Sequence, residues 1–137
     1  MGLRLRVLQA ATDSDIDAAF QMMSDSHIGA LFIGTDPFFN GRSAQLAAMA
    51  ARRGIATIYQ YRDFAAAGGL LSYGASYTEP MRLVGIYIGR VLRGEKPSDL
   101  PVQESTKVEL FINLRTAKAL GLAVPQTILV AADEVIE

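Results

Sequence analysis

Short apolar runs alternate along this chain with longer segments of helical spacing, and this alternation restricts the fold more than any other feature of the sequence. The runs that we interpret as strands are 3–8, 30–33, 55–59, 70–73 and 107–112, with a further strand or turn from residue 125 onward. Strands that alternate with helices predict an α/β fold with a mostly parallel sheet flanked by helices. The 137 residues leave room for one domain of ordinary size.

The expected helices are recognised by the residues at their ends and by their spacing. Thr12 followed by Asp15 resembles a capping box, and Ile16 and Phe20 then fall on one helical face. The other expected helices are 42–53, 63–67, 78–93 and 114–120, and we interpret 35–41 as a loop. The run 30–33 is nearly all apolar, which is typical of a strand covered on both faces.

Charge and composition exclude several classes of protein. The 13 basic and 14 acidic residues leave a net charge of -1, which argues against nucleic-acid binding by phosphate neutralisation. The absence of cysteine excludes disulfide scaffolds, cysteine-based zinc sites and thiol catalysis. The apolar stretches are far shorter than the roughly 20 residues of a membrane helix. The first residues show no signal peptide, so we expect the chain to be cytoplasmic as expressed.

No motif for catalysis, for a metal or for a cofactor is complete in this sequence. The glycine-rich phosphate loops of nucleotide-binding proteins are absent. A near match to the hydrolase motif G-x-S-x-G around Ser72 has Leu70 where glycine is required. The single histidine, His27, precedes that serine and has no second histidine or cysteine with which to share a metal. We therefore expect a protein that is not an enzyme, without metal or cofactor.

Four loops follow the carboxyl ends of expected strands and therefore lie at one edge of the sheet. Ligands of parallel α/β sheets bind beyond the carboxyl ends of the strands. The loops at this edge are 10–13, 35–41, 60–62 and 73–76. We expect any ligand contacts to come from these segments.

Several short segments of the sequence, taken together, resemble one protein family. They are 68–74 (GGLLSYG), 94–103 (GEKPSDLPVQ), 106–114 (TKVELFINL), 116–122 (TAKALGL) and 132–136 (ADEVI), with 34–39 (GTDPFF) and 58–64 (IYQYRDF) in the first half. In this order and spacing, the chain closely resembles the C-terminal half of the ABC-transporter substrate-binding proteins, a family that includes tryptophan- and tyrosine-type binding components.

The resemblance implies a two-lobed, clam-shell receptor of the periplasmic-binding-protein type I fold, of which this chain is an incomplete lobe. Such receptors capture a small solute, for example an amino acid, in the periplasm and pass it to ABC permease subunits. Members of the family are longer and begin with an export signal and an N-terminal lobe. We therefore expect 1–74 to form the second-lobe α/β unit, 75–100 a crossover helix of the other lobe, and 101–137 the return segment.

The truncation that this resemblance implies has a physical consequence for the longest helix. If 78–93 belongs to a missing lobe, its apolar face lacks cover; that face carries Met81, Val84, Ile88 and Leu92. An exposed apolar stripe is a binding surface or an aggregation hazard. We therefore expect the chain to form a homodimer or a larger homo-oligomer.

Six residues are candidate ligand contacts: Thr35, Asp36, Phe38, Tyr61, Ser72 and Tyr73. The Asp36 carboxylate can pair with a ligand ammonium group, or it can hold an Asx turn in the loop. Thr35 can add a hydroxyl group or cap the same loop. Phe38, together with Phe39, can form a stacking wall for an aromatic solute or can simply pack in the core.

The remaining candidates carry similar alternatives. Tyr61 and Tyr73 follow strands, where a phenol can contact a ligand or seal the core, and Ser72 is a weaker candidate. Arg42 and Arg62 can bind a carboxylate in bidentate fashion, although arginines at helix starts are more often solvated. The leading hypothesis is the solute-binding component of an ABC importer. The alternatives are a folded oligomeric fragment that binds nothing, and a small α/β enzyme or signalling domain.

Overall fold

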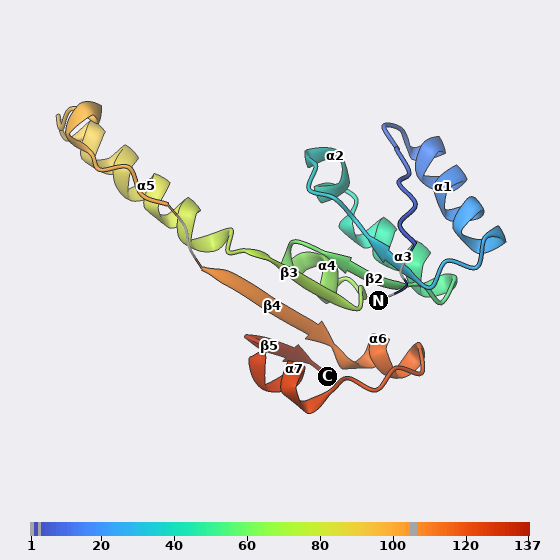
Figure 1. Ribbon diagram of the computed structural model, residues 1–137. Coiled ribbons are helices and arrows are strands. Elements are labelled where there is room, and N and C mark those ends of the chain that lie inside the picture. The colour runs from blue at the N-terminus through green and yellow to red at the C-terminus, as the bar shows by residue number, and fades with distance from the viewer. Residues whose placement is uncertain (1, 3, 105–106) are drawn as a thin grey trace.

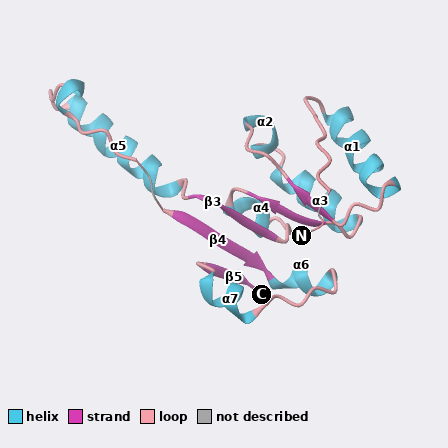
Figure 2. Ribbon diagram, viewed as in Figure 1, coloured by secondary structure: helices cyan, strands magenta, loops and turns pink. Residues whose placement is uncertain are grey.

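In the computed structural model, which describes Gly2, residues 4–104 and residues 107–137, the strands form one sheet in the order β1-β2-β3-β4-β5 (Figure 2). The strands are β1 (Ala30–Phe32), β2 (Ala56–Tyr59), β3 (Leu71–Ala75), β4 (Val108–Asn113) and β5 (Glu134–Ile136). β1, β2 and β3 are parallel, β4 is antiparallel to β3, and β5 is parallel to β4. The predicted α/β fold with a mostly parallel sheet is confirmed.

The helices of the described residues are α1 (Asp13–Asp25), α2 (Pro37–Asn40), α3 (Ser43–Arg52), α4 (Arg62–Ala66), α5 (Thr78–Leu92), η1 (Pro97–Asp99, a 3-10 helix), α6 (Leu114–Ala119) and α7 (Gln126–Ala131). Side-chain hydrogen bonds cap the first turns of α1, α2 and α6 among these helices. The capping box predicted at α1 is present, because Thr12 Oγ1 accepts a hydrogen bond from the Asp15 amide and Asp15 Oδ2 accepts one from the Thr12 amide. Asn113 caps α6 by accepting from the Thr116 amide at 3.0 Å.

The capping carboxylate of Asp15 predicts a pH dependence of stability. Hydrogen bonds from the amides of Ala11 and Thr12 and from the Thr12 side chain hold the pKa of Asp15 below its usual range. A depressed folded-state pKa stabilises the fold above the unfolded-state value of about 4, and this contribution is lost as the pH falls. We expect Asp15→Asn to reduce the pH dependence of urea unfolding between about pH 5 and pH 3. Asp17→Asn, in the same helix, is the control; equal slopes for the two variants would contradict the prediction.

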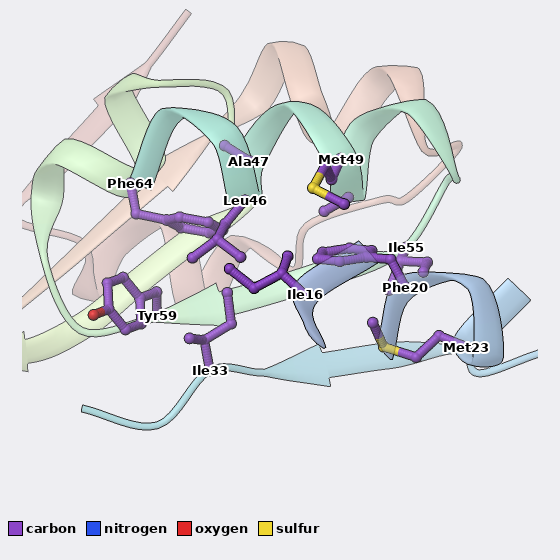
Figure 3. Close-up of a cluster of buried hydrophobic side chains, with 11 residues drawn as sticks. Ile16, Phe20, Met23, Ile33, Leu46, Ala47, Met49, Ile55, Tyr59 and Phe64 are labelled. Carbon is purple, nitrogen blue, oxygen red and sulfur yellow. The ribbon is translucent and has the colours of Figure 1, made fainter. Parts of the chain in front are cut away.

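The main core lies between α1, α3 and one face of β1 and β2 (Figure 3). Its buried residues are Ile16, Phe20, Met23, Ile33, Leu46, Ala47, Met49, Ala50, Ile55, Tyr59 and Phe64. The spacing of these residues places one apolar stripe on each helix and alternate positions of each strand against each other. Burial of this cluster fixes α1, α3 and the start of α4 on the sheet.

The path of the chain decides which face of each strand is covered. Right-handed crossovers between parallel strands place α3 and α4 on the same face of β1, β2 and β3. Because β4 and β5 run in the opposite direction, the same rule places α6 and α7 on the other face, beside β4 and β5. The second face of β1, β2 and β3 therefore receives no helix from the described part of this chain.

Two strand predictions are corrected by this arrangement. The run 30–33 is covered on one face only, and Phe32 is 72% exposed on the other. Residues 4–8 of the expected strand 3–8 are not in a strand, and Leu5 is 90% exposed; Leu3 lies outside the described residues. Alternating side chains give residues 4–8 the pattern of a strand, but a strand also needs backbone hydrogen bonds to a neighbouring strand. Residues 4–8 do not pair with β1, so β1 remains the edge of the sheet.

Smaller differences concern the ends of elements. The expected loop 35–41 contains α2, whose first residue is Pro37, a favoured residue at that position. β3 continues past Tyr73 to Ala75, because it pairs with β4 along this whole length. The segment from residue 125 onward forms α7 before it reaches β5.

Helix α5 extends away from the rest of the molecule as an arm (Figure 1), and the described residues of the segment that follows it return alongside. The Tyr87 hydroxyl donates to the Pro101 carbonyl at 2.7 Å and joins the two. α5 has no buried residue, and the exposed fractions of Met81, Val84 and Ile88 are 46%, 49% and 54%. The expected apolar stripe is therefore largely exposed, and Val84, Ile88 and Leu92 share a hollow with Leu100, Pro101 and Val102 of the returning segment. Within the described residues, no helix has the length and apolar content needed to cross a membrane.

Candidate functional site

A hollow of about 540 Å³ lies at the carboxyl ends of β2 and β3, beside the start of α4. Its lining residues are Asn40, Ser43, Gln60, Tyr61, Arg62, Asp63, Gly74, Ala75, Tyr77, Thr78, Glu109 and Phe111. A larger hollow of about 1090 Å³ lies over the uncovered sheet face and has an apolar floor. The smaller hollow combines aromatic rings with convergent polar groups at the strand ends, so we take it as the candidate site.

Aromatic side chains form one wall of this candidate site. The Tyr61 ring meets the Tyr77 ring edge to face with centroids 5.7 Å apart, and it meets the Tyr59 ring in the same way at 6.3 Å. Tyr59 is fully buried, and this burial raises the pKa of its phenol. Tyr61 thus stands on a fixed ring from the core and presents its other side toward the hollow.

A chain of hydrogen bonds joins the ends of β1 and β2 to α2. Thr35 Oγ1 donates to Gln60 Oε1, and Gln60 Nε2 donates to Asn40 Oδ1 at 3.2 Å. The Tyr59 hydroxyl also donates to Asn40 Oδ1. The side-chain amides of Gln60 and Asn40 are therefore held in place at the hollow, and Thr35 acts on it through Gln60.

Arg62 provides the positive charge of the site. Its Nε and Nη2 atoms donate to the two carboxylate oxygens of Glu134 at 2.7 Å and 2.5 Å. The hydrogen bond to Glu134 raises the pKa of Arg62, and the same bond lowers the pKa of Glu134. Its guanidinium carbon lies 5.9 Å from the centre of the Phe111 ring. Because both partners are partly exposed, the pair orients the guanidinium at the hollow more than it stabilises the fold.

Two carboxylates provide the negative charge of the site. Glu109 and Asp63 line the hollow, and Glu109 accepts a hydrogen bond from Lys107 Nζ at 2.6 Å. The hollow thus carries one guanidinium, two carboxylates and a pair of tyrosine rings. This combination suits a small solute that has both an anionic and a cationic group and an apolar or aromatic part.

The candidates Thr35, Asp36 and Phe38 lie beside the hollow rather than in its lining, to which the 35–41 segment contributes Asn40. Asp36 caps α2, because its Oδ1 accepts a hydrogen bond from the Phe38 amide at 2.7 Å, as the Asx-turn alternative predicts. The Phe38 ring packs on Phe39 and lies under the Arg42 guanidinium, whose central carbon is 3.8 Å from the ring centre. Arg42 Nε in turn donates to Asp13 Oδ1 at 2.6 Å.

The structure separates Ser72 and Tyr73 from Tyr61. Ser72 is fully buried on the helix-covered face, and its hydroxyl has no hydrogen-bond partner among the described residues. Tyr73, the next residue, points to the other face and is 59% exposed. Successive side chains of a strand alternate between faces, so these two neighbours do not reach the hollow that Tyr61 lines.

Several residues that line the hollow are not among the candidates predicted from the sequence. Tyr77 and Phe111 are not among the six candidate contacts, yet both line the hollow. Gln60 lies in the loop 60–62, which is predicted to contact ligands because it follows the carboxyl end of a strand (the strand-end rule). Its polar side-chain amide is the feature that could have identified it there. Glu109 had no such signal, because it reaches the hollow only through the antiparallel pairing of β4 with β3.

Titratable side chains are not grouped as a metal site requires. Across residues 4–104 and 107–137, no group of three or more His, Cys, Asp or Glu side chains is placed to hold a metal ion. The acidic residues of the hollow are instead engaged with, or close to, basic side chains.

Comparisons with known proteins agree with this fold. The sequence profile of a family described as ABC transporter substrate binding protein matches residues 1–136. No curated protein matches the sequence. A conserved domain protein from Vibrio cholerae has a TM-score of 0.77 at 21% identity, with 92% of this chain and 42% of that chain covered.

Two further solved structures are similar. The ABC domain from Streptococcus pneumoniae, crystallised in complex with L-Trp, has a TM-score of 0.77 at 24% identity, with 90% of this chain and 41% of that chain covered. A ligand-free, open substrate binding protein with adhesive properties from Clostridium difficile has a TM-score of 0.60 at 22% identity, with 93% and 42% covered. The present chain thus spans only 41–42% of the length of these proteins.

Proposed function

Because the chain belongs to the ABC transporter substrate binding protein family, we propose that it binds a small organic solute in the hollow at the carboxyl ends of β2 and β3. The observation that carries this proposal is the convergence of Tyr61, Arg62 and Glu109 on one space. Aromatic, cationic and anionic groups meet there at the sheet edge where α/β proteins bind their ligands. The family is a non-enzymatic component of transport, and the proposed role is capture without chemical change.

We propose an amino acid with an aromatic side chain as the solute class. Arg62 would bind the carboxylate, Glu109 or Asp63 the ammonium group, and the rings of Tyr61 and Tyr77 the aromatic part. The similar protein from Streptococcus pneumoniae that was crystallised with L-Trp supports this choice.

The residues of the 35–41 segment have supporting roles in this proposal. Thr35 orients the Gln60 amide, and Asp36 holds α2 in place so that Asn40 reaches the hollow. Phe38 stiffens the same segment through its contacts with Phe39 and Arg42. Ser72 and Tyr73 have no part in it.

We further propose how the site works in transport. Residues 75–100 would cross to a second lobe, and closure of that lobe over the hollow would enclose the solute. Delivery to the permease of an ABC importer, in the periplasm or outside the cell, would follow. The position of α5 supports this proposal, because the helix begins at the rim of the hollow, where Tyr77 and Thr78 are lining residues.

Thermal unfolding with and without L-tryptophan tests the binding proposal. A ligand at 100 times its dissociation constant stabilises the folded state by about 2.7 kcal/mol, which raises the melting temperature measurably. We expect a rise with aromatic amino acids and none with a simple sugar. Absence of any rise across the amino acids would instead favour a fragment that binds nothing.

Substitution of Tyr61 by alanine tests the position of the site. Loss of the ring contact predicts an affinity about 2- to 12-fold weaker, measured by calorimetric titration. Tyr73→Ala is the matched control, because Tyr73 also lies near a strand end but on the other face of the sheet. We expect this control to leave affinity unchanged; an equal effect of both variants would place the solute elsewhere.

A further inference from the structure

Two hydrogen bonds converge on the side-chain oxygen of Asn40, the last residue of α2. The Tyr59 hydroxyl donates to Asn40 Oδ1, and Gln60 Nε2 donates to the same atom at 3.2 Å. An amide oxygen accepts with two lone pairs, so these two bonds fill its capacity. Within the described part of the chain, the side-chain hydrogen bonds of Asn40 thus end on Oδ1, and Nδ2 keeps its hydrogens for another partner.

The Tyr59 hydroxyl determines which way the Asn40 amide is turned. The Tyr59 ring is fully buried in the core, and its hydroxyl lies at the margin of the cluster (Figure 3). The hydroxyl has one hydrogen, and the Asp36 carbonyl, 3.5 Å away, already accepts from the amides of Phe39 and Asn40 at 3.1 Å. A turned amide, with Nδ2 against the hydroxyl, would send that hydrogen to this more distant carbonyl. Burial raises the pKa of Tyr59, so the phenol keeps the hydrogen that holds Asn40 Oδ1.

The Gln60 amide is turned in the same sense. Thr35 Oγ1 donates to Gln60 Oε1, which leaves Gln60 Nε2 to face Asn40. That bond uses one of the two Nε2 hydrogens. Both amides line the candidate site. Because their oxygens face partners within the network, what this pair offers the hollow is N–H groups.

A pair of donors matches one group of the proposed solute. In a zwitterionic amino acid the ammonium group only donates, and an indole or phenyl side chain carries no strong acceptor, whereas the carboxylate only accepts. Arg62, the cation of the same hollow, donates from Nε and Nη2 to Glu134 and so keeps the hydrogens of Nη1. A carboxylate has about four lone-pair sites, enough for the guanidinium and for an amide together.

We propose that Asn40 is a specificity-determining residue that donates from Nδ2 to the solute carboxylate, together with Arg62, and that Tyr59 is the positioning residue that turns the Asn40 amide toward the solute. This assignment rests on the proposed function and adds a contact to it. A site built to hydrogen-bond one group of its ligand rejects analogues without that group, because its own donors are then left unpaired. The hollow therefore binds L-tryptophan more tightly than tryptamine, which has the same ring and amine but no carboxylate.

Asn40→Asp tests the donor, because it replaces Nδ2 by an oxygen and keeps an acceptor for Tyr59 and Gln60. We expect L-tryptophan to bind about 10- to 150-fold more weakly in calorimetric titration, the loss of one hydrogen bond to a charged group. Tryptamine should bind as tightly as before or more tightly, since the new charge attracts its ammonium group. Gln45→Glu is the matched control: it makes the same change from amide to carboxylate on an exposed residue of α3 outside the hollow, and both ligands should bind as they do to the wild type.

Tyr59→Phe tests the positioning role, since it removes the hydroxyl and keeps the buried ring. Without the hydroxyl the Asn40 amide can turn, and we expect L-tryptophan to bind about 2- to 10-fold more weakly while the affinity for tryptamine stays unchanged. A merely structural effect would weaken the binding of both ligands alike, and that result would overturn the role of Tyr59.

These measurements separate the failure of this inference from failure of the proposed function. Wild-type selectivity between the two ligands in Asn40→Asp, with unchanged circular dichroism, would overturn the role of Asn40 and leave the solute-binding hollow in place. A wild-type protein that binds neither L-tryptophan nor any other aromatic amino acid would overturn the proposed function, and this inference with it.

Discussion

Substitution of Phe64 by alanine will lower the free energy of unfolding by about 3–5 kcal/mol, the cost of removing a buried aromatic ring and leaving a cavity. Phe64 is fully buried, and its ring meets the ring of Tyr59 with centroids 5.6 Å apart. Single domains are stable by only about 5–15 kcal/mol, so this one change removes a large share of the total.

Phe64 also connects the core to the candidate site. It lies in α4, two residues after Arg62, and its backbone carbonyl accepts a hydrogen bond from Gly69 at 2.9 Å. Urea unfolding monitored by circular dichroism measures the loss. Val130→Ala, at a position that is 77% exposed, should change stability by less than about 0.5 kcal/mol. A Phe64→Ala variant within 1 kcal/mol of the wild type would show that α4 packs differently.

Substitution of Gly74 by alanine will disturb both the sheet and the site. A Cβ atom at this position would lie 2.5 Å from the Gln60 carbonyl oxygen and 3.1 Å from the Gln60 Cα atom. The obstacle is backbone, so β2 and β3 must move apart where they reach the rim of the hollow. Overpacking of this kind costs about 1–3 kcal/mol.

The same movement predicts weaker binding, because Gln60 and Tyr61 line the hollow and both lie at the displaced end of β2. Calorimetric titration and urea unfolding of Gly74→Ala measure the two effects. Gly89→Ala is the control: nothing lies within 4 Å of its added Cβ atom. Because alanine favours helix by up to about 1 kcal/mol over glycine, this control should be neutral or slightly stabilising. Wild-type stability and affinity in Gly74→Ala would contradict the close approach of the two strands.

Local signals in the sequence predicted the elements that depend on near neighbours. The capping box at Thr12 and Asp15 is formed, and the stripe of Ile16, Phe20 and Met23 is buried as its spacing predicts. Hydrogen bonds within one turn and side chains one turn apart decide these features. The expected strand 3–8 failed because its pattern satisfies the same local rule but its described residues, 4–8, have no neighbouring strand with which to pair.

The candidate site was predicted only where the strand-end rule applies. Tyr61, in a loop that the rule marks, lines the hollow, whereas Tyr73 follows the same rule and lies on the opposite face. The two tyrosines differ because β3 continues to Ala75, so Tyr73 lies inside a strand, where successive side chains point to opposite faces. Its neighbour Gly74 faces Gln60, and Tyr73 points the other way. The predicted end of a strand is uncertain by a residue or two, and one residue is enough to exchange the faces.

The amino-acid sequence by itself determined the α/β class, most of the helices and strands, and the family, because each of these depends on residue types at short spacings along the chain. Only the tertiary structure decided that β4 runs antiparallel to β3, that Glu109 reaches the hollow, and that one face of β1, β2 and β3 receives no helix from the described part of the chain. These features depend on contacts between residues far apart in the sequence. The direction of a strand and the handedness of each connection, rather than any local pattern, place those residues together.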